Sequence, residues 1–247
     1  MIDIHSHLLP GVDDGSPSLA VSVPVLTRMK AEGVTAVVCT PHWNASRAAT
    51  APVADYQERL ALLKAAVPEG PALHLGFEIL LDAPGVDLSM PGLTLAGTRA
   101  LLVEFSRGPL PPGATAELRR LVTSGFVPVV THPERYLGCT LEMVQSWRAF
   151  GVVIQVEARA LERKGQHAVM ARAMLADGLI DLVASDNHGD DRSIAAVRDW
   201  MIAHGGQVQA ELLTRLNPDR LLSGRSLDPV PAMATSAMDR VRRLFGG

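Results

Sequence analysis

Two histidines lie close together near the start of the chain, in the stretch Ile2-Asp3-Ile4-His5-Ser6-His7. If the apolar run before them is a β-strand, side chains two residues apart point to the same face. Imidazole is the commonest metal ligand near neutral pH, so the pair could supply half of a transition-metal coordination sphere. Two histidines can also fall together in a loop by chance, and the pair alone leaves both alternatives open.

Other residues of the same chemical kind follow later apolar segments. They are His42, Glu78, Glu104, His132, Asp186 and His188, with Asp13 and Asp14 in the loop after the histidine pair. The C-terminal ends of parallel strands are where α/β folds place their chemistry, so we expect these side chains to meet. A buried carboxylate needs a partner, and clustered carboxylates repel one another, whereas divalent cations resolve both problems. The set exceeds what one ion requires and predicts two or three ions bridged by carboxylates, as in phosphatases and nucleases.

Some residues keep a second interpretation. Asp13 and Asp14 compete for one role, because Asp-Asp-Gly is also an ordinary turn sequence. Glu104 could instead form an ion pair with Arg107 or Arg135.

His42 could be an ordinary loop histidine. Five further residues are left outside the predicted site. Glu134 and Glu157 fit less well the strand-end rule, by which a ligand directly follows a strand. We expect the other three in strand or helix interiors: His74, His167 and His204.

Two arginines follow predicted ligands closely. Arg135 comes after His132, and Arg192 after His188. A guanidinium matches a pair of phosphate oxygens, so a metal cluster flanked by arginines suggests a phosphate ester substrate. Surface ion pairing is the alternative, and it weighs more for Arg192 than for Arg135.

Length and composition fit one large soluble domain. The chain has 247 residues, with 47% hydrophobic and 20% charged residues and a net charge of -3, which argues against an electrostatic nucleic-acid footprint. There is no apolar run of about 20 residues and no secretory signal, so we expect no membrane insertion. The two cysteines, Cys39 and Cys139, indicate no disulfide framework, and a cytoplasmic location is expected.

Strand-like and helix-like segments alternate along the chain. The expected strands are Ile2–Ile4, Val34–Cys39, Ala72–Phe77, Ala100–Val103, Val127–Thr131, Val152–Val156 and Leu179–Ala184. Their lack of polar alternation is typical of parallel strands buried on both faces, in a barrel or an open doubly wound sheet.

The helix-like segments have recognisable ends. The first is expected from an N-cap at Ser16 to Gly33, with a bend or a split at Pro24. The others are Asp55–Ala66, Thr115–Thr123, Thr140–Phe150, Lys164–Ala176, Arg192–Ala203 and a last helix near Met233–Phe245. Asp82–Gly97 has no clear element, and Asn217–Gly224 is expected to be a turn.

The combined motifs resemble the PHP (polymerase and histidinol phosphatase) superfamily, and in particular the manganese-dependent protein-tyrosine phosphatases of bacterial capsule and exopolysaccharide biosynthesis. The motifs are His5-Ser6-His7, Asp13-Asp14-Gly15, Thr40-Pro41-His42, Gly76-Phe77-Glu78, Glu104-Phe105-Ser106, His132-Pro133-Glu134-Arg135-Tyr136 and Ser185-Asp186-Asn187-His188. The resemblance extends to about Gly224.

The resemblance implies an α/β fold, a distorted seven-stranded (β/α) barrel of the TIM-like, PHP type, as a single domain over residues 1–247 with a core to about 224 and a helical tail. It also implies three divalent metal ions, with Mn²⁺ expected and Fe or Zn as alternatives. The ions would be held by His5, His7, Glu78 and Asp186; by Glu78, Glu104 and His132; and by Asp14, His42 and His188. Arg135 and Arg192 would bind the substrate phosphate, although the spacing from His188 to Arg192 is one residue shorter than expected.

The expected activity is that of a metal-dependent phosphomonoesterase, a protein-tyrosine phosphatase in which a metal-bridging hydroxide attacks phosphorus. The implied substrate is the tyrosine-rich tail of a bacterial tyrosine autokinase that regulates polysaccharide assembly. The alternatives are histidinol-phosphate hydrolysis, nucleotide phosphodiester hydrolysis, or a catalytically silent regulatory barrel. The divergent stretches Trp43–Pro71 and Pro109-Leu110-Pro111-Pro112 would border the mouth of the site and influence substrate preference.

Overall fold

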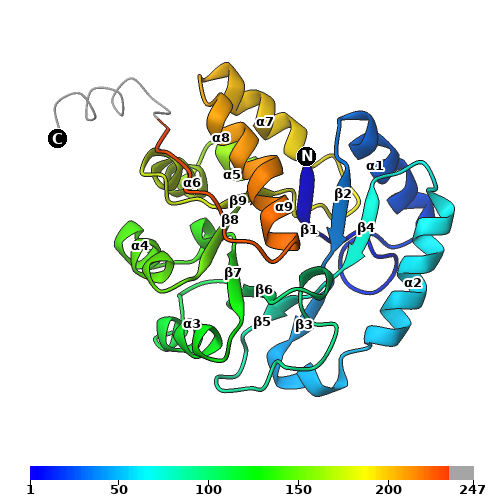
Figure 1. The fold of residues 1–247 in the computed structure, drawn as a ribbon, viewed down its shortest axis with the longest axis horizontal. Helices are drawn as coiled ribbons and strands as arrows, with labels where there is room; N and C mark the ends of the chain where they lie inside the picture. Colours follow the sequence, from blue (N-terminus) through cyan, green and yellow to red (C-terminus); the bar gives the residue numbers. More distant parts are fainter. Residues whose placement is uncertain (234–247) are drawn as a thin grey trace.

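Parallel strands form the centre of the molecule, and helices surround them (Figure 1). The computed structural model describes residues 1–233, so the expected helix near Met233–Phe245 lies almost entirely outside the described residues. The strands are β1 (Ile2–Ser6), β2 (Ala36–Cys39), β3 (His42–Asn44), β4 (Ala72–Leu75), β5 (Glu78–Leu80), β6 (Ala100–Glu104), β7 (Val127–Thr131), β8 (Val153–Glu157) and β9 (Leu182–Ala184). The predicted parallel α/β fold is confirmed, because every pair of neighbouring strands is parallel.

The strands belong to two sheets. At two places the chain passes from one sheet to the other through a short break, from β2 to β3 and from β4 to β5. One sheet has the order β1-β2-β4 and the other β3-β5-β6-β7-β8-β9. The short strands β3 and β5 were not predicted; they continue β2 and β4 after a break. Pro41 lies in the first break, where it cannot donate a ladder hydrogen bond. Gly76 lies in the second, where a Cβ would come within 2.7 Å of Leu95 Cδ2. Each break places a predicted ligand, His42 or Glu78, at the first position of a new strand.

Hydrogen bonds between the first and last strands bring the two sheets together on the other side. The Ser185 amide donates to Asp3 Oδ1 at 3.0 Å, and the Asp186 amide donates to the His5 carbonyl at 3.0 Å. The His7 amide then donates to the Asn187 carbonyl at 2.7 Å. The seven runs of strand therefore form a ring with irregular junctions, which agrees with the distorted barrel that the resemblance implied and not with an open doubly wound sheet.

Two apolar cores follow from the alternation of side chains along the strands. Inward positions fill the centre of the ring in one cluster, which includes Ile4, Val38, Leu102, Val129, Val153 and Leu182. Neighbouring outward positions, such as Val37, Val103 and Val130, pack with the surrounding helices in a second cluster. Leu221 belongs to the inner cluster and closes it at one end.

The helices are α1 (Leu19–Ala31), α2 (Val53–Ala66), α3 (Ala114–Thr123), α4 (Leu141–Ala149), α5 (Ala158–Glu162), α6 (Gln166–Ala176), α7 (Ile194–Ala203), α8 (Gln207–Glu211) and α9 (Asn217–Leu222). Short 3-10 segments η1 (Ala45–Thr50), η2 (Leu95–Gly97) and η3 (Pro133–Arg135) lie in the connections, and η4 (Leu212–Leu216) is a π-helical turn.

The helix predictions need correction at four places. Helix α1 has its N-cap at Ser18 and not at Ser16, and it continues through Pro24 as one helix. Helices α5 and α8 were not predicted, because five residues each are too few to show a helical period. The segment expected to be a turn from Asn217 is largely the helix α9, which begins with Pro218 in its first turn, where a missing N–H costs little.

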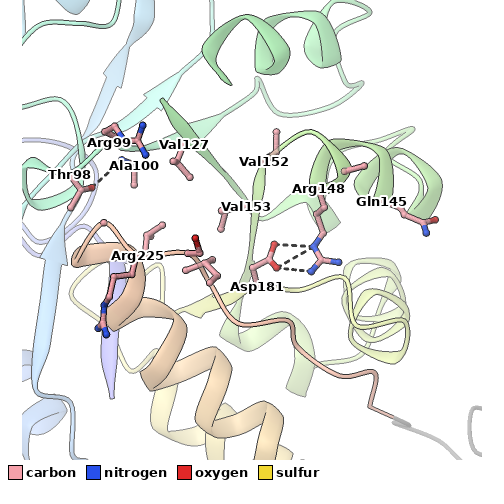
Figure 2. A pocket seen from close by; sticks show the side chains of 16 residues that line it. Thr98, Arg99, Ala100, Val127, Gln145, Arg148, Val152, Val153, Asp181 and Arg225 are labelled. Carbon is pink, nitrogen blue, oxygen red and sulfur yellow. Dashed lines mark hydrogen bonds and ion pairs between the residues drawn. The ribbon is translucent and has the colours of Figure 1, made fainter. Parts of the chain in front are cut away.

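A cavity of about 690 Å³ lies at the end of the ring where the strands begin (Figure 2). Its lining includes Ala100 and Val127 at the starts of β6 and β7, and Arg99, which precedes β6. The Asp181 carboxylate, one of its lining groups, is paired with Arg148 at 2.8 Å. Among residues 1–233, no helix has both the length and the apolar character needed to cross a membrane.

Candidate metal centre

The predicted ligands meet at the other end of the ring, where the strands end. A cavity of about 480 Å³ lies there, lined by Asp14, His42, Glu78, Glu104, Phe105, Arg107, His132, Arg135, Tyr136, His167, Asp186, His188 and Arg192. His5 and His7 are fully buried beneath it. All nine predicted ligands therefore come from strand ends, or from the loops after them, and gather at one place.

The histidine pair at the end of β1 forms the floor of the centre. His5 Nδ1 donates a hydrogen bond to Gln155 Oε1 at 2.9 Å, and His7 Nδ1 donates to Asp13 Oδ2 at 2.7 Å. A neutral imidazole whose Nδ1 carries the proton has its lone pair on Nε2. The two Nε2 atoms lie 3.1 Å apart, so their lone pairs converge on one point, as a shared cation requires.

Two carboxylates complete this arrangement. Glu78 Oε2 lies 3.2 Å from each of the two Nε2 atoms of His5 and His7, and Asp186 Oδ1 lies 3.5 and 3.4 Å from them. Neighbouring ligands at such spacings lie about 2.0 Å from the centre of a tetrahedral site, which matches metal–ligand bonds. Adjacent corners of an octahedron at this spacing lie about 2.3 Å from its centre, which also suits a divalent ion. The donor set therefore fits a metal ion.

Glu78 joins this floor to the rest of the centre. Its Oε2 also lies 3.1 Å from His42 Nδ1, and its Oε1 accepts from Thr131 Oγ1 and lies 3.1 Å from His132 Nε2. Glu104 Oε1 lies 3.1 Å from the same nitrogen of His42, and Glu104 Oε2 lies 3.9 Å from His132 Nε2. Both carboxyl oxygens of Glu78 thus face potential ligands, as a bridging carboxylate would.

The loop after β1 separates the roles of its two aspartates. Asp14 Oδ1 lies 3.4 Å from His42 Nε2 and 3.6 Å from His188 Nε2, inside the cavity. Asp13 instead supports His7 from behind and accepts the His42 amide at 3.2 Å. Gly15 allows this path, because a Cβ there would lie 2.3 Å from His7 Cβ.

The potential ligand atoms form three groups, and within each group all atoms lie within 4.8 Å of one another. The groups are His7, Asp14, His42 and His188; His5, His7 and Asp186; and His42, Glu78 and Glu104. The first contains the set predicted for the third ion, and the second is part of the set predicted for the first. The last contains His42 where the resemblance implied His132.

The charges of the cluster shift the pKa values of its members in opposite directions. Burial favours the neutral form of His5, but the charges of Glu78 and Asp186 outweigh it and raise the His5 pKa. Burial likewise favours a protonated Glu78, but His5, His132 and His42 hold its pKa well below the usual range. The carboxylates are therefore ionised, and the metal-free cluster binds protons that a cation would replace.

Two of the predicted ligands have left-handed backbone conformations. His132 has φ 35° and Asp186 has φ 51°, which is uncommon for residues other than glycine. Each is the first or second residue after an inward-facing strand end, where the chain must turn sharply to present the side chain. Such conformations are concentrated at functional sites, where the surrounding structure holds them in place.

Both predicted phosphate-binding arginines are already held by carboxylates. Arg135 Nη2 donates to Glu157 Oε2 and to Asp186 Oδ2, each at 2.6 Å. Arg192 Nε donates to Asp190 Oδ2 at 2.8 Å, and its Nη1 contacts the Asp186 carbonyl. Their guanidinium groups line the cavity in fixed orientations. Glu157, which was not among the predicted site residues, orients Arg135.

The structure brings in residues that sequence reasoning missed. Gln155 is fully buried on β8 and holds His5, and the signal available was a polar residue inside the apolar run Val152–Val156. His167 was expected away from the site, but it lies in the first turn of α6 and lines the cavity. The suggested pairing of Glu104 with Arg107 or Arg135 does not occur, since Glu104 faces His42 and His132.

We expect Gln155→Leu to weaken Mn²⁺ binding by about tenfold or more, because His5 loses the acceptor that keeps its proton on Nδ1. Gln155→Glu retains an acceptor oxygen at the same reach and serves as the matched control, with binding closer to that of the unaltered protein. Titration of the metal-free proteins with Mn²⁺ in the presence of a competing chelator measures the difference. If Gln155→Leu and the unaltered protein bound Mn²⁺ with equal affinity, Gln155 would not be the residue that orients His5.

A family described as capsular polysaccharide synthesis, CpsB/CapC, has a model that matches residues 1–223. The tyrosine-protein phosphatase YwqE of Bacillus subtilis (strain 168) is 30% identical over 146 residues, a match that spans 55% of this chain and 55% of that protein. The tyrosine-protein phosphatase CpsB of Streptococcus pneumoniae is 28% identical over 204 residues, which cover 77% of this chain and 84% of CpsB.

Two solved structures resemble the chain to different degrees. One from work on YwqE of Bacillus subtilis and CpsB of Streptococcus pneumoniae, described as unique metal-dependent tyrosine phosphatases, superposes with a TM-score of 0.75 at 25% identity, covering 96% of this chain and 100% of that one. The phosphotriesterase of Mycobacterium tuberculosis has a TM-score of 0.53 at 13% identity, with 83% of this chain and 84% of that one covered. The second likeness shows the fold alone.

Proposed function

Because the chain belongs to the capsular polysaccharide synthesis family CpsB/CapC, we propose that it is a metal-dependent protein-tyrosine phosphatase. The observation that carries the proposal is the convergence of His5 Nε2 and His7 Nε2, 3.1 Å apart, with Glu78 Oε2 and Asp186 Oδ1, each of which lies 3.2 to 3.5 Å from both nitrogens. Each imidazole donates its other nitrogen to an acceptor, which is the arrangement of metal-ligating histidines.

We assign three divalent ions to the centre, with Mn²⁺ expected and Fe or Zn as alternatives. His5, His7, Glu78 and Asp186 would hold the first. Glu78 would bridge to the second, which Glu104 and His132 would also hold. Asp14, His42 and His188 would hold the third. The 3.1 Å spacing between His42 Nδ1 and Glu104 Oε1 supports a place for His42 near the second ion as well.

Divalent ions bound here would lower the pKa of a coordinated water and neutralise charge on the phosphoryl oxygens. Arg135 would bind a phosphate oxygen from the side of Asp186 and Glu157, which hold its guanidinium in place. Arg192 would contact the same phosphate from the α7 side, oriented by Asp190. The phosphoryl group is thus oriented by fixed cations, as a phosphoryl-transfer transition state requires.

The two cysteines do not suit a thiol-based mechanism. Burial raises the pKa of the Cys39 thiol to about 12, and burial raises that of Cys139 to about 12 as well. Neither cysteine lines the cavity of the metal centre. A cysteine phosphatase needs an accessible thiolate near neutral pH, and neither residue supplies one.

We expect chelation to abolish hydrolysis of a phosphotyrosine peptide, whereas thiol alkylation leaves it intact. The purified protein is treated with EDTA or with iodoacetamide, and activity is followed together with metal content by elemental analysis. Restoration by Mn²⁺ after chelation completes the test, with about three ions per chain expected from the assignment above. Loss of activity on alkylation, with no loss on chelation, would contradict the proposal.

We propose that the substrate is a phosphotyrosine protein, namely the tyrosine-rich tail of a bacterial tyrosine autokinase that regulates polysaccharide assembly. The reaction would take place in the cytoplasm. Parallel assays with a phosphotyrosine peptide, histidinol phosphate and a dinucleotide separate this activity from other hydrolytic reactions. Turnover of the peptide at least about tenfold above the others supports the proposal. An absence of turnover with every substrate would instead favour a regulatory protein.

A further inference from the structure

Three arginines line the cavity of the metal centre, and one of them is uncommitted. Arg135 and Arg192 are paired with carboxylates at 2.6 and 2.8 Å. Arg107 is exposed and forms no hydrogen bond or ion pair with any residue from 1 to 233. An arginine that faces a cavity without a partner is available for an anionic group that arrives with a ligand.

The loop that carries Arg107 is fixed at both sides of this residue. The Phe105 amide donates to the Tyr136 hydroxyl at 3.1 Å, and the Leu137 amide donates to the Gly108 carbonyl at 2.9 Å. Pro109 and Leu137 form a parallel bridge. These contacts attach the Arg107 loop to the segment after η3 that follows Arg135, so Arg107 has a defined position over the cavity although its side chain is free.

Depth distinguishes Arg107 from the arginines assigned to the phosphate. The candidate metal ligands Glu78 and His132 are buried, and Arg135 hydrogen-bonds to the buried Asp186. Arg107 is exposed at the rim. A phosphate held at the floor therefore places the remainder of the substrate, and not the phosphate itself, against Arg107.

The carboxylates that line the cavity face its histidines and also Arg135 and Arg192, and among residues 1–233 none forms an ion pair with Arg107. His167 lines the cavity from α6, and the loop before α6 carries the exposed side chains of Arg163 and Lys164. Asp14 faces His42 and His188, and Glu104, which also lines the cavity, faces His42 and His132. The rim formed by Arg107 and His167 thus favours an anionic partner.

We propose that Arg107 is a specificity-determining residue, which binds an anionic side chain beside the phosphotyrosine of the substrate. The proposal rests on the phosphatase function proposed above. The anionic group is a carboxylate or a second phosphate, since both match a guanidinium fork.

The test is a cycle of two enzymes and matched peptides. The unaltered enzyme and Arg107→Ala are assayed with one phosphotyrosine peptide that has Glu, Gln or a second phosphotyrosine beside the reactive residue. For the unaltered enzyme we expect kcat/KM to be about fivefold higher with Glu than with Gln, mainly through KM, as for an accessible ion pair. Arg107→Ala reduces this ratio to about one. The second phosphotyrosine, compared with Glu, identifies which anion the rim prefers.

Arg99→Ala is the matched control. Arg99 precedes β6, whereas Arg107 follows it; Arg99 is also exposed, has no ion-pair partner among residues 1–233, and lies in the cavity at the opposite end of the ring (Figure 2). This variant should keep the fivefold preference. A preference that decreases at high salt in the unaltered enzyme supports the ion pair, because exposed charges are screened.

Two results would overturn the proposal. A ratio near one in the unaltered enzyme would show that no flanking anion is recognised. An equal loss with the Glu and Gln peptides in Arg107→Ala would show that Arg107 acts on the phosphate common to both. Failure of the proposed function is distinct, because the enzyme would then hydrolyse none of the peptides.

Discussion

Glu78→Gln is expected to remove metal from the centre and to lower phosphotyrosine hydrolysis by at least about a hundredfold. The reason is the central place of this carboxylate, whose Oε2 lies within 3.2 Å of nitrogens on His5, His7 and His42. An amide carries less negative charge and would turn a donor toward the ligand atoms, which opposes a cation. Metal content, measured by elemental analysis, should fall together with activity.

Glu117→Gln is the matched control for this experiment. Glu117 is also buried, but it lies on α3 and pairs with Arg120 at 2.6 Å, away from the cavity. Its loss should lower thermal stability while metal content and turnover stay the same. If Glu78→Gln retained its metal and its activity, the proposed centre would have to be abandoned.

The second large effect concerns pH. In the metal-free protein, burial favours neutral His42, but hydrogen bonds with Glu104 and Glu78 outweigh it and raise its pKa to about 10. A metal ion must displace this proton, so apparent Mn²⁺ affinity should increase with pH up to that value. The slope is about tenfold per pH unit for each proton released.

The same shifts set opposite trends of stability with pH. A raised histidine pKa contributes stability that is complete below the unfolded value of 6.5 and is lost as pH increases through about 10. The lowered pKa values of Glu78 and Asp186 contribute stability above their ordinary values of 4.5 and 3.8, lost as pH falls. These groups therefore stabilise the metal-free protein most between about 4.5 and 6.5, while the gain from Mn²⁺ increases above this window.

Thermal unfolding with and without Mn²⁺, at about pH 6 and about pH 9, measures this effect. We expect the metal-induced increase in Tm to be larger at the higher pH. His42→Gln should reduce this pH dependence, whereas His204→Gln, whose side chain lies against Trp200 on α7, should not. A larger metal-induced gain at the lower pH would contradict the proton displacement.

The sequence predicted most of the architecture, because buried parallel strands leave a strong local signal. The seven expected strand runs all contain a strand, and Val127–Thr131 matches its observed bounds. The errors lie where long-range packing overrides local preference. Strands β3 and β5 exist because Pro41 and the approach of Leu95 to Gly76 interrupt longer runs, and α1 accommodates Pro24 without a break.

The candidate ligands could be predicted because the rule that selects them is topological. Parallel strands all end on one side, so a His, Asp or Glu at each strand end is directed to the same region wherever the strand lies in the sheet. Residues that act through another side chain do not follow this rule. Gln155 gives only the weak signal of a polar residue within an apolar strand, and Glu157 shows its role only through its contact with Arg135; His167, in the first turn of a helix, is likewise revealed only by its place in the cavity lining.

By itself, the sequence determined which residues could form a metal centre, since their types and their positions after apolar runs are local properties. Only the tertiary structure decided which of these residues face the cavity and which support a neighbouring ligand. In the structure Asp14 faces the cavity, whereas Asp13 hydrogen-bonds to His7 from behind. The two differ because the loop passes within contact distance of His7 at Gly15. The tertiary structure also paired Arg135 with Glu157 and Asp186, which lie far from it in the sequence, and left Arg107 without an ion-pair partner among residues 1–233.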